Sequence, residues 1–201
     1  IKAWKRWGNT AEQIIKSNPY VLCIQGVDLS FSRADAVAAK SDIPADSECR
    51  IKAGITYILR QNADQGHTCL PLDSLVKTAV SYLDVDEKLI KKVIEDETEE
   101  ENLYYYDKHG RRFVMLADFY KAEDYIARRL AIMRQISYDN KIDFSEVIDL
   151  EEENNGIQYE KIQREAINLA LSKGFLVLTG GPGTGKTTTL NAIISLYQQQ
   201  G

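Results

Sequence analysis

Apolar residues recur at the spacing of an amphipathic α-helix over most of the chain. In the first part this pattern predicts helices that begin near residues 10, 32, 51 and 71, and a further helix that either Asp84 or Asp86 can cap. Proline marks two boundaries, since Pro19 ends the first of these helices and Pro71 suits the first turn of the fourth. The start of the chain is therefore predicted to be a helix, a tight turn and a second helix.

Strand-like patterns are few. Residues 103–106 and 112–116 are predicted as short strands, and residues 107–110 between them supply a hairpin turn. Helices followed by such a hairpin are the order of elements expected of a winged helix. Further along, residues 175–179 form a continuous apolar run, which is typical of a strand buried on both faces.

Helical spacing returns in the second part, where helices are predicted over residues 118–136, over residues 159–172 and from about Lys186. Residues 137–156 are polar and acidic, and residues 151–156 are the expected linker. The predicted apolar faces of the last two helices carry Ile162, Ala166, Leu169, Ala170, Leu190, Ile193, Ile194 and Tyr197.

Composition sets limits on the class of protein. The net charge of −5 argues against a globally basic DNA-coating protein but leaves room for local basic patches. No run approaches the ~18 apolar residues of a membrane span. Three separated cysteines without a CxxC pair fit a reduced cytoplasm rather than a disulfide framework or a zinc site. The first residues lack a methionine and a signal-peptide pattern, so we expect a boundary inside a longer protein.

Gly180, four further residues, Gly185, Lys186 and Thr187 match the P-loop (Walker A) pattern for binding nucleotide phosphates. Glycines allow positive φ angles and let backbone N–H groups approach the phosphates. Lys186 is predicted to reach the β- and γ-phosphates of ATP, and the Thr187 hydroxyl to ligate Mg²⁺. These are the predicted catalytic residues. A glycine-rich turn that binds no nucleotide is the alternative.

The predicted cofactor-binding residues of the loop are Gly181, Pro182, Gly183, Thr184, Gly185, Lys186, Thr187 and Thr188. A P-loop motor also requires an acidic residue on a later strand and usually an arginine finger. Because the sequence stops at Gly201, we expect this piece to bind nucleotide at most and not to turn over ATP by itself.

The loop and its surroundings resemble a known enzyme family. Residues 178–190, Leu-Thr-Gly-Gly-Pro-Gly-Thr-Gly-Lys-Thr-Thr-Thr-Leu, preceded by Gln-Arg-Glu-Ala-Ile at residues 163–167, resemble superfamily 1 helicases of the 5′→3′ branch. The resemblance implies that Gln163 reads the adenine edge of ATP. A solvated helix residue is the alternative for Gln163.

Earlier motifs narrow the resemblance to RecD-like ATP-dependent DNA helicases. They are Ser-Asn-Pro-Tyr at residues 17–20, Phe-Ser-Arg-Ala-Asp at 31–35, Gly-His-Thr-Cys-Leu-Pro at 66–71 and Phe-Tyr-Lys-Ala-Glu at 119–123. The family's activity implies ATP-driven 5′→3′ unwinding of DNA in repair or recombination, with single strands and duplex junctions as partners.

The same resemblance implies a multidomain, mainly α fold. Its parts are a helix-hairpin-helix region (residues 1–66), a winged-helix-like segment (67–117), a connecting helix with an acidic linker (118–156) and the start of a RecA-like α/β P-loop domain (157–201).

The hairpin departs from the pattern of a DNA-binding helix-hairpin-helix. Asp28-Leu29-Ser30 stands where the family pattern has Gly-hydrophobic-Gly, whose backbone N–H groups face DNA phosphates. A carboxylate and an added side chain oppose phosphate binding there. A structural or protein-contact role is therefore favoured over a DNA-binding role for this hairpin.

Basic and aromatic clusters are further candidates. Arg111, Arg112, Arg128 and Arg129 are the predicted DNA-binding residues, although a solvated helix face is the favoured alternative for the basic cluster. The three tyrosines at residues 104–106 could stack bases, but half-buried tyrosines of a hairpin are the favoured interpretation. For the whole protein, a P-loop ATPase of another kind, or a non-enzymatic DNA- or protein-binding adaptor, remain the alternative functions.

Overall fold

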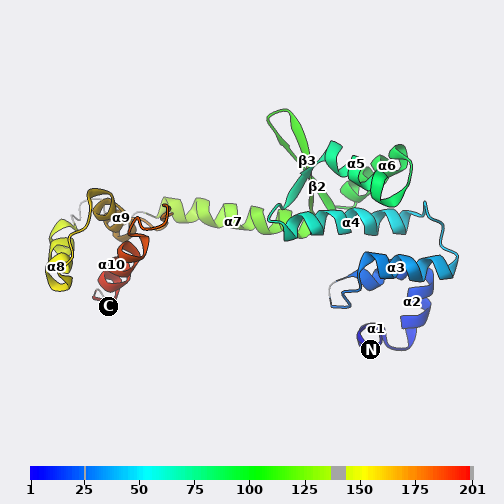
Figure 1. Ribbon diagram of the computed structural model, residues 1–201, viewed down its shortest axis with the longest axis horizontal. Helices are drawn as coiled ribbons and strands as arrows, with labels where there is room; N and C mark the ends of the chain where they lie inside the picture. Colours follow the sequence, from blue (N-terminus) through cyan, green and yellow to red (C-terminus); the bar gives the residue numbers. More distant parts are fainter. Residues whose placement is uncertain (25, 137–143, 200–201) are drawn as a thin grey trace. The chain divides into compact units, whose positions relative to one another are not determined.

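The computed structural model describes residues 1–24, 26–136 and 144–199, and it divides into two compact units, Ile1–Ala122 and Glu123–Gly201 (Figure 1). The described residues are mainly helical with one small sheet, which confirms the predicted fold class. No described helix is both long and apolar enough to span a membrane.

The first unit is built from helices that alternate with short turns. Its elements are α1 (Lys2–Trp7), η1 (Gly8–Thr10), α2 (Ala11–Ser17), η2 (Pro19–Cys23), α3 (Phe31–Ala38), η3 (Ala39–Ser41), α4 (Glu48–Asp64), β1 (Cys69–Pro71), α5 (Leu72–Leu83), α6 (Glu87–Glu99), β2 (Leu103–Lys108), β3 (Arg111–Leu116) and the start of α7 (Ala117–Gln135). Side-chain hydrogen bonds to the backbone fix the N-terminal ends of two of these helices. The Asn18 side chain accepts the backbone N–H of Tyr20, and Asp86 caps α6 by accepting the N–H of Lys88.

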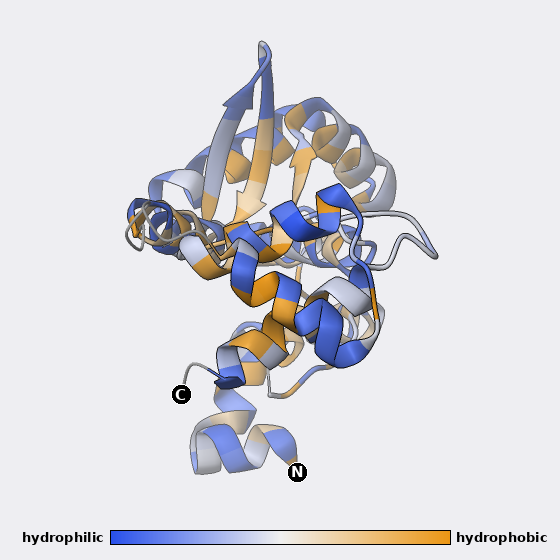
Figure 2. Ribbon diagram, turned by 90° about the vertical axis from the view of Figure 1, so that its left-hand side faces the viewer, coloured by the Kyte–Doolittle hydropathy of each residue, from blue (hydrophilic) through white to orange (hydrophobic). Residues whose placement is uncertain are grey.

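The core of the first unit gathers on α4, whose inner face meets those of α5 and α6. In Figure 2 the helices beside the sheet are coloured hydrophobic where they face the sheet and hydrophilic on the opposite side. Ile51, Ile55 and Leu59 of α4 are almost completely buried, and each such side chain contributes about 1.5–3 kcal/mol. A Cβ at Gly54 would lie 2.6 Å from Leu83 Cδ2, so the end of α5 packs closely against α4 because residue 54 has no side chain.

A three-stranded antiparallel sheet in the order β1-β3-β2 closes this core. The β2–β3 hairpin turns at His109 and Gly110, which both take positive φ angles, 50° and 73°. Such angles at both central residues suit a tight hairpin turn. Strand β1 pairs with β3 on the side opposite to β2. This strand was not predicted, since three residues are too short to show alternation.

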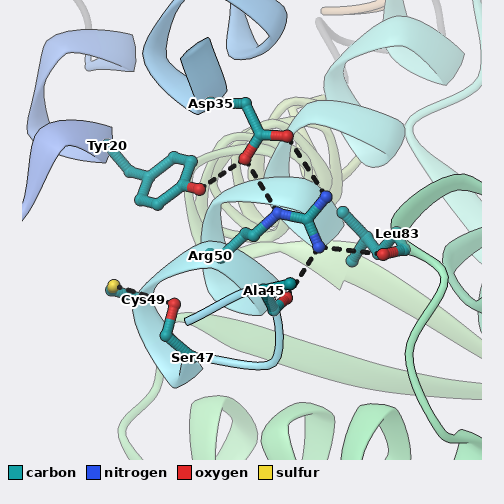
Figure 3. A network of polar contacts seen from close by, with 7 residues as sticks. All are labelled: Tyr20, Asp35, Ala45, Ser47, Cys49, Arg50 and Leu83. Carbon is teal, nitrogen blue, oxygen red and sulfur yellow. Dashed lines mark hydrogen bonds and ion pairs between the residues drawn. The ribbon is translucent and has the colours of Figure 1, made fainter. Parts of the chain in front are cut away.

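A polar network joins the first helices to α4 and α5 (Figure 3). The Arg50 guanidinium donates to both carboxylate oxygens of Asp35, at 2.8 and 3.1 Å, and to the carbonyls of Ala45 and Leu83. The Tyr20 hydroxyl donates to the same carboxylate at 2.5 Å. The Arg50 hydrogen bonds hold the pKa of Asp35 below its ordinary value.

The second unit contains the rest of α7 and three further helices, α8 (Ser145–Asn155), α9 (Lys161–Ser172) and α10 (Lys186–Gln199). The predicted linker at residues 151–156 is wrong. Those residues finish α8, and Gly156 ends it with a left-handed φ of 61°. Glu151 is only 3% exposed and accepts hydrogen bonds from Asn155 and Gln199, so the acidic residues belong to a packed helix. The part of the linker prediction at residues 137–143 lies outside the described residues.

Ion pairs fix α9 to α8. Arg164 lies 2.6 Å from Glu152 and 2.5 Å from Asp149, and its hydrogen bond to Asp149 is the main cause that raises the pKa of Arg164. On the apolar side, α9 and α10 pack on each other and on α8. This unit is therefore held by contacts between helices.

The predicted apolar faces of α9 and α10 are wrong at several positions. Ile162 is 79% exposed, and Leu169, Leu190, Ile194 and Tyr197 are also exposed. The buried positions are Ala166, Ile167, Ala170, Leu171, Thr189, Ala192, Ile193 and Leu196. Each helix carries more apolar residues than one contact covers, so the neighbouring helix decides which of them are buried.

The predicted buried strand at residues 175–179 is also wrong. These residues adopt no regular strand, and Val177 is 64% exposed. A central strand requires neighbouring strands to complete its hydrogen bonds, and the described part of this unit supplies none.

Replacement of Asp35 by asparagine tests the polar network. Because the pKa of Asp35 is lowered in the folded state, its charge stabilises the fold above pH of about 4 and this contribution is lost as the pH falls through the lower folded-state value. Asp35→Asn is expected to reduce the free energy of unfolding by about 1–3 kcal/mol at pH 7, and by less at pH 3.

Urea unfolding at both pH values measures this difference. Glu12→Gln, which removes an exposed pair with Lys16, is the matched control and is expected to leave the free energy of unfolding almost unchanged, because water screens exposed ion pairs. Equal effects of the two substitutions would contradict a stabilising role for the network.

Candidate functional site

The glycine-rich loop at residues 180–187 connects the segment after α9 to the first residue of α10. Gly183 and Gly185 both have φ angles of 75°, in the region where other residues are strained. A Cβ at Gly180 would lie 2.7 Å from Thr184 Oγ1. The loop therefore needs glycine at these positions for its conformation and for close packing.

Lys186 turns back into the loop from the first turn of α10. Its ammonium donates to the backbone carbonyls of Gly180, at 2.6 Å, and of Gly181. The Thr184 hydroxyl also donates to the carbonyl of Gly181, at 2.9 Å. The helix N-terminus adds partial positive charge from its free N–H groups beside this ammonium. Positive charge from the lysine and from the helix N-terminus therefore lies beside the exposed backbone of the glycine-rich loop.

Gln163 lies against the loop from α9. Its side-chain oxygen accepts the backbone N–H of Glu160 in a capping box, and its Nε2 is 3.4 Å from the carbonyl oxygen of Gly185. A Cβ on Gly185 would lie 2.2 Å from Gln163 Nε2. The absence of a side chain at residue 185 therefore lets Gln163 reach the loop.

A cavity of about 540 Å³ extends from the loop to Gln163. Of the predicted site residues, Gln163, Gly183, Thr184, Gly185 and Lys186 line it together. Gly180, the first residue of the P-loop pattern, lines it as well. The lining residues that the sequence did not identify as site residues are Glu160, Ile162, Ala166, Leu178, Thr179 and Thr189. The spacing of Glu160 to Gln163 is that of a capping box and could have indicated Glu160, whereas the others depend on tertiary packing.

The remaining predicted residues do not line this cavity. Gly181 and Pro182 are exposed, and Thr187 is exposed next to Lys186. Thr188 borders a different cavity, together with Tyr159 and Asn191. Thr189 is buried instead, and its hydroxyl donates to the carbonyl of Gly185 at 3.0 Å, which fixes the end of the loop.

The site fits the phosphates and the magnesium ion of a nucleotide. Positive-φ glycines, a lysine ammonium and a helix N-terminus meet at one curve of backbone, and each favours an anion there. The Thr187 hydroxyl is exposed and suits a metal ion that phosphate oxygens also hold. Among the described residues no cluster of three or more His, Cys, Asp or Glu side chains forms a separate metal site.

The predicted DNA-binding arginines differ in their surroundings. Arg112 pairs with Asp107 at 3.0 Å and lies over the ring of Tyr105, and Arg128 pairs with Asp124 at 2.7 Å. Within the described residues, Arg111 and Arg129 form no ion pair. Arg111 and Arg112 belong to the hairpin of the first unit, whereas Arg128 and Arg129 lie on α7 in the second unit.

Asp28 binds its own hairpin. Its carboxylate accepts the backbone N–H of Gly26 at 3.0 Å and pairs with Lys2 at 3.1 Å. These two interactions, with Lys2 the larger cause, lower the pKa of Asp28. The carboxylate therefore lies in the hairpin itself, held by a backbone amide and a lysine of the same unit.

Comparison with known proteins identifies related sequences at both ends of the chain. Residues 1–69 match the family model of the ATP-dependent RecD2 DNA helicase HHH domain, and residues 163–201 match that of an AAA domain. Over 38 residues the chain is 58% identical to RecBCD enzyme subunit RecD of Mycobacterium tuberculosis and of Mycolicibacterium smegmatis. These alignments cover 19% of this chain and 7% of each relative, so the chain spans a small part of the curated relatives' length.

Replacement of Gly185 by alanine tests the site's geometry. The added Cβ conflicts with both the positive φ angle and the Gln163 side chain, so the substitution is expected to weaken nucleotide binding about tenfold or more. Fluorescence titration with a labelled ATP analogue measures the affinity. Gly156→Ala is the matched control, because Gly156 has a similar φ of 61° but open space around it. Equal affinities of the two variants would contradict the close approach of Gln163.

Proposed function

We propose that this chain, which belongs to the RecD-like DNA helicases, carries the ATP-binding loop of a motor that unwinds DNA in the 5′→3′ direction. The family matches at residues 1–69 and 163–201 support a helicase-type function. The observation that carries the proposal is the single cavity shared by Lys186 and Gln163. One cavity with a phosphate-binding lysine and an amide suited to a base is what an ATP site requires.

Lys186 is proposed to bind the β- and γ-phosphates. Its present partners are the neutral carbonyls of Gly180 and Gly181, and charge-assisted hydrogen bonds to phosphate are stronger than such bonds. The ammonium would exchange these carbonyls for phosphate oxygens without leaving the loop. The backbone of Gly181, Pro182, Gly183 and Thr184 would enclose the phosphates, with Thr188 in the first turn of α10 behind them.

Thr187 is proposed to ligate Mg²⁺ through its hydroxyl, because it follows Lys186 and is exposed beside the loop. When bound, the ion would neutralise charge on the phosphates. Gln163 is proposed to hydrogen-bond the adenine edge, since an amide offers both a donor and an acceptor. The exposed Ile162 side chain gives the cavity an apolar wall for the flat face of a base.

The residues around this cavity are suited to binding rather than to hydrolysis. ATP hydrolysis requires an acidic or amide group that orients water, and a cation at the transferred phosphate. Glu160 is the acidic residue that lines the cavity, and its carboxylate caps α9 by accepting the backbone N–H of Gln163. We therefore infer that turnover depends on groups beyond the lining of this cavity.

An unwinding assay tests the function. In the full-length protein that contains this chain, Lys186→Ala is expected to abolish ATP-dependent unwinding of forked DNA with a 5′ tail, because the phosphates lose their cation. Strand separation followed by a fluorescent label measures the rate. Lys161→Ala, an exposed lysine on α9 outside the cavity, is the matched control and is expected to retain activity.

Three results would contradict the proposal. Unwinding that survives Lys186→Ala would remove the role given to the lysine. Absence of DNA-stimulated ATP hydrolysis in the unaltered protein would remove the helicase function itself. Unwinding from a 3′ tail alone would overturn the proposed direction.

Gln163→Ala tests how the base is recognised. The substitution removes the proposed contact to adenine but leaves the phosphate loop in place, so the preference for ATP over GTP is expected to fall about tenfold, with little change in GTP binding. Competition titrations with both nucleotides measure the preference. Gln163→Glu keeps the oxygen that caps α9 and controls for loss of the helix cap. An unchanged preference in both variants would assign Gln163 a structural role only.

A further inference from the structure

One face of the β2–β3 hairpin carries aromatic and basic side chains that nucleotide binding does not use. Successive residues of a strand point to opposite faces. The inner face carries Leu103, Tyr105, Val114 and Leu116, which contact the core of the first unit. The opposite face, called here the outer face, carries Tyr104, Tyr106, Lys108, Arg111, Phe113 and Met115. Figures 1 and 2 show the tip of this hairpin extending away from the helices of its own unit.

The rings of the outer face form a row along the hairpin. The Tyr104 ring is stacked on Tyr120 of α7, with centroids 4.1 Å apart and planes 4° from parallel. Tyr106 lies opposite Phe113, with centroids 6.4 Å apart. Tyr106 is 47% exposed and Tyr120 is 37% exposed, so the rings are held in place by their neighbours while part of each remains accessible.

Two cations face each other at the end of this row. Lys108 and Arg111 are directly paired across the strands, and both are exposed. Like charges placed opposite each other destabilise a hairpin. Within the described residues neither has an acidic partner in an ion pair, whereas the neighbouring Arg112 is neutralised by Asp107. An anion bound at the tip would relieve the repulsion.

We propose that the outer face of the hairpin binds single-stranded DNA. Bases would stack on the exposed rings of Tyr106 and its neighbours, and phosphates would contact Lys108 and Arg111. That the ligand is DNA rests on the proposed function. The new elements are the site on the hairpin and the preference for a single strand.

The combination of groups favours a single strand over other polyanions. The bases of a duplex are stacked on each other and present no face to a ring, so duplex DNA would use the cations alone. An acidic peptide would likewise leave the exposed rings unused. At the base of the hairpin, Tyr104 lies beside Glu101, which places the phosphate contacts toward the tip.

The two predicted DNA-binding arginines of the hairpin lie on opposite faces. Arg111 lies on the outer face with the exposed rings, so its charge is available to a phosphate. Arg112 points to the inner face, where it pairs with Asp107 and covers Tyr105. The proposal therefore keeps Arg111 as a DNA-binding residue and gives Arg112 a structural role.

Fluorescence anisotropy with the 201-residue chain and a labelled oligothymidylate of about 16 nucleotides, without ATP, tests the proposal. Tyr106→Ala is expected to weaken binding about fivefold or more, and Tyr106→Phe to restore it. The double variant Lys108→Ala, Arg111→Ala is expected to make the dependence of log affinity on log salt concentration shallower, by about 1.4 in the slope. The matched control, Asp107→Asn with Arg112→Gln, keeps the net charge and is expected to bind within about twofold of the unaltered chain.

Three results would overturn the proposal. They are binding unaffected by Tyr106→Ala, equal affinity for a duplex of the same length, and equally effective competition by polyglutamate. The outcome is distinguishable from that of the proposed function, because Lys186→Ala leaves the hairpin intact and is expected to bind the oligonucleotide normally. Tyr106-dependent binding in a protein that does not unwind DNA would refute the motor function and support this site.

Discussion

The close approach of Gln163 to the carbonyl of Gly185 is the constraint on which the nucleotide site depends. It requires glycine at residue 185, because any Cβ would occupy the position of the glutamine amide. It also requires α9 to begin where its capping box sets it, since Glu160 and Gln163 hold each other. Packing between α9 and α10 then brings the Gln163 amide and the Lys186 ammonium to one cavity. Local capping, helix packing and ligand recognition are thus linked through one contact.

The first unit is stabilised by apolar burial and by a charged network. Apolar residues of α4 to α6 supply most of its burial, and the charged network of Tyr20, Asp35 and Arg50 joins the N-terminal helices to that core. With Asp28 bonded to Gly26 and Lys2, the N-terminal hairpin offers little to a phosphate. The β2–β3 hairpin, in contrast, leaves its rings and two cations exposed. A chain of negative net charge can therefore present a local surface suited to DNA.

Much of this could be predicted from the sequence, for reasons that are local. The P-loop pattern predicted Gly185 and Lys186 as site residues, and both line the cavity, while their role in phosphate binding stays a prediction. Helical spacing located most helices, and the turn residues located the β2–β3 hairpin. The errors arose where a neighbour decides the outcome. Ile162 and Leu190 lie on apolar stripes that no described element covers, and residues 175–179 have no described strand to pair with. Likewise, the strand register decides which of the three tyrosines of β2 face the core and which lie on the outer face, and sequence alone does not give that register.

The central claim is that one cavity binds both the phosphates and the base. Nuclear magnetic resonance of the isotopically labelled chain tests it most directly, through the backbone amides of Gly183, Gly185 and Lys186 and the side-chain amide of Gln163. Titration with Mg²⁺ and ATP is predicted to shift both sets of signals at the same midpoint, whereas inorganic tripolyphosphate is predicted to shift the loop amides without the same change at Gln163. The account would be contradicted if ATP shifted the signals of the loop amides but changed the Gln163 side-chain signal no more than tripolyphosphate does.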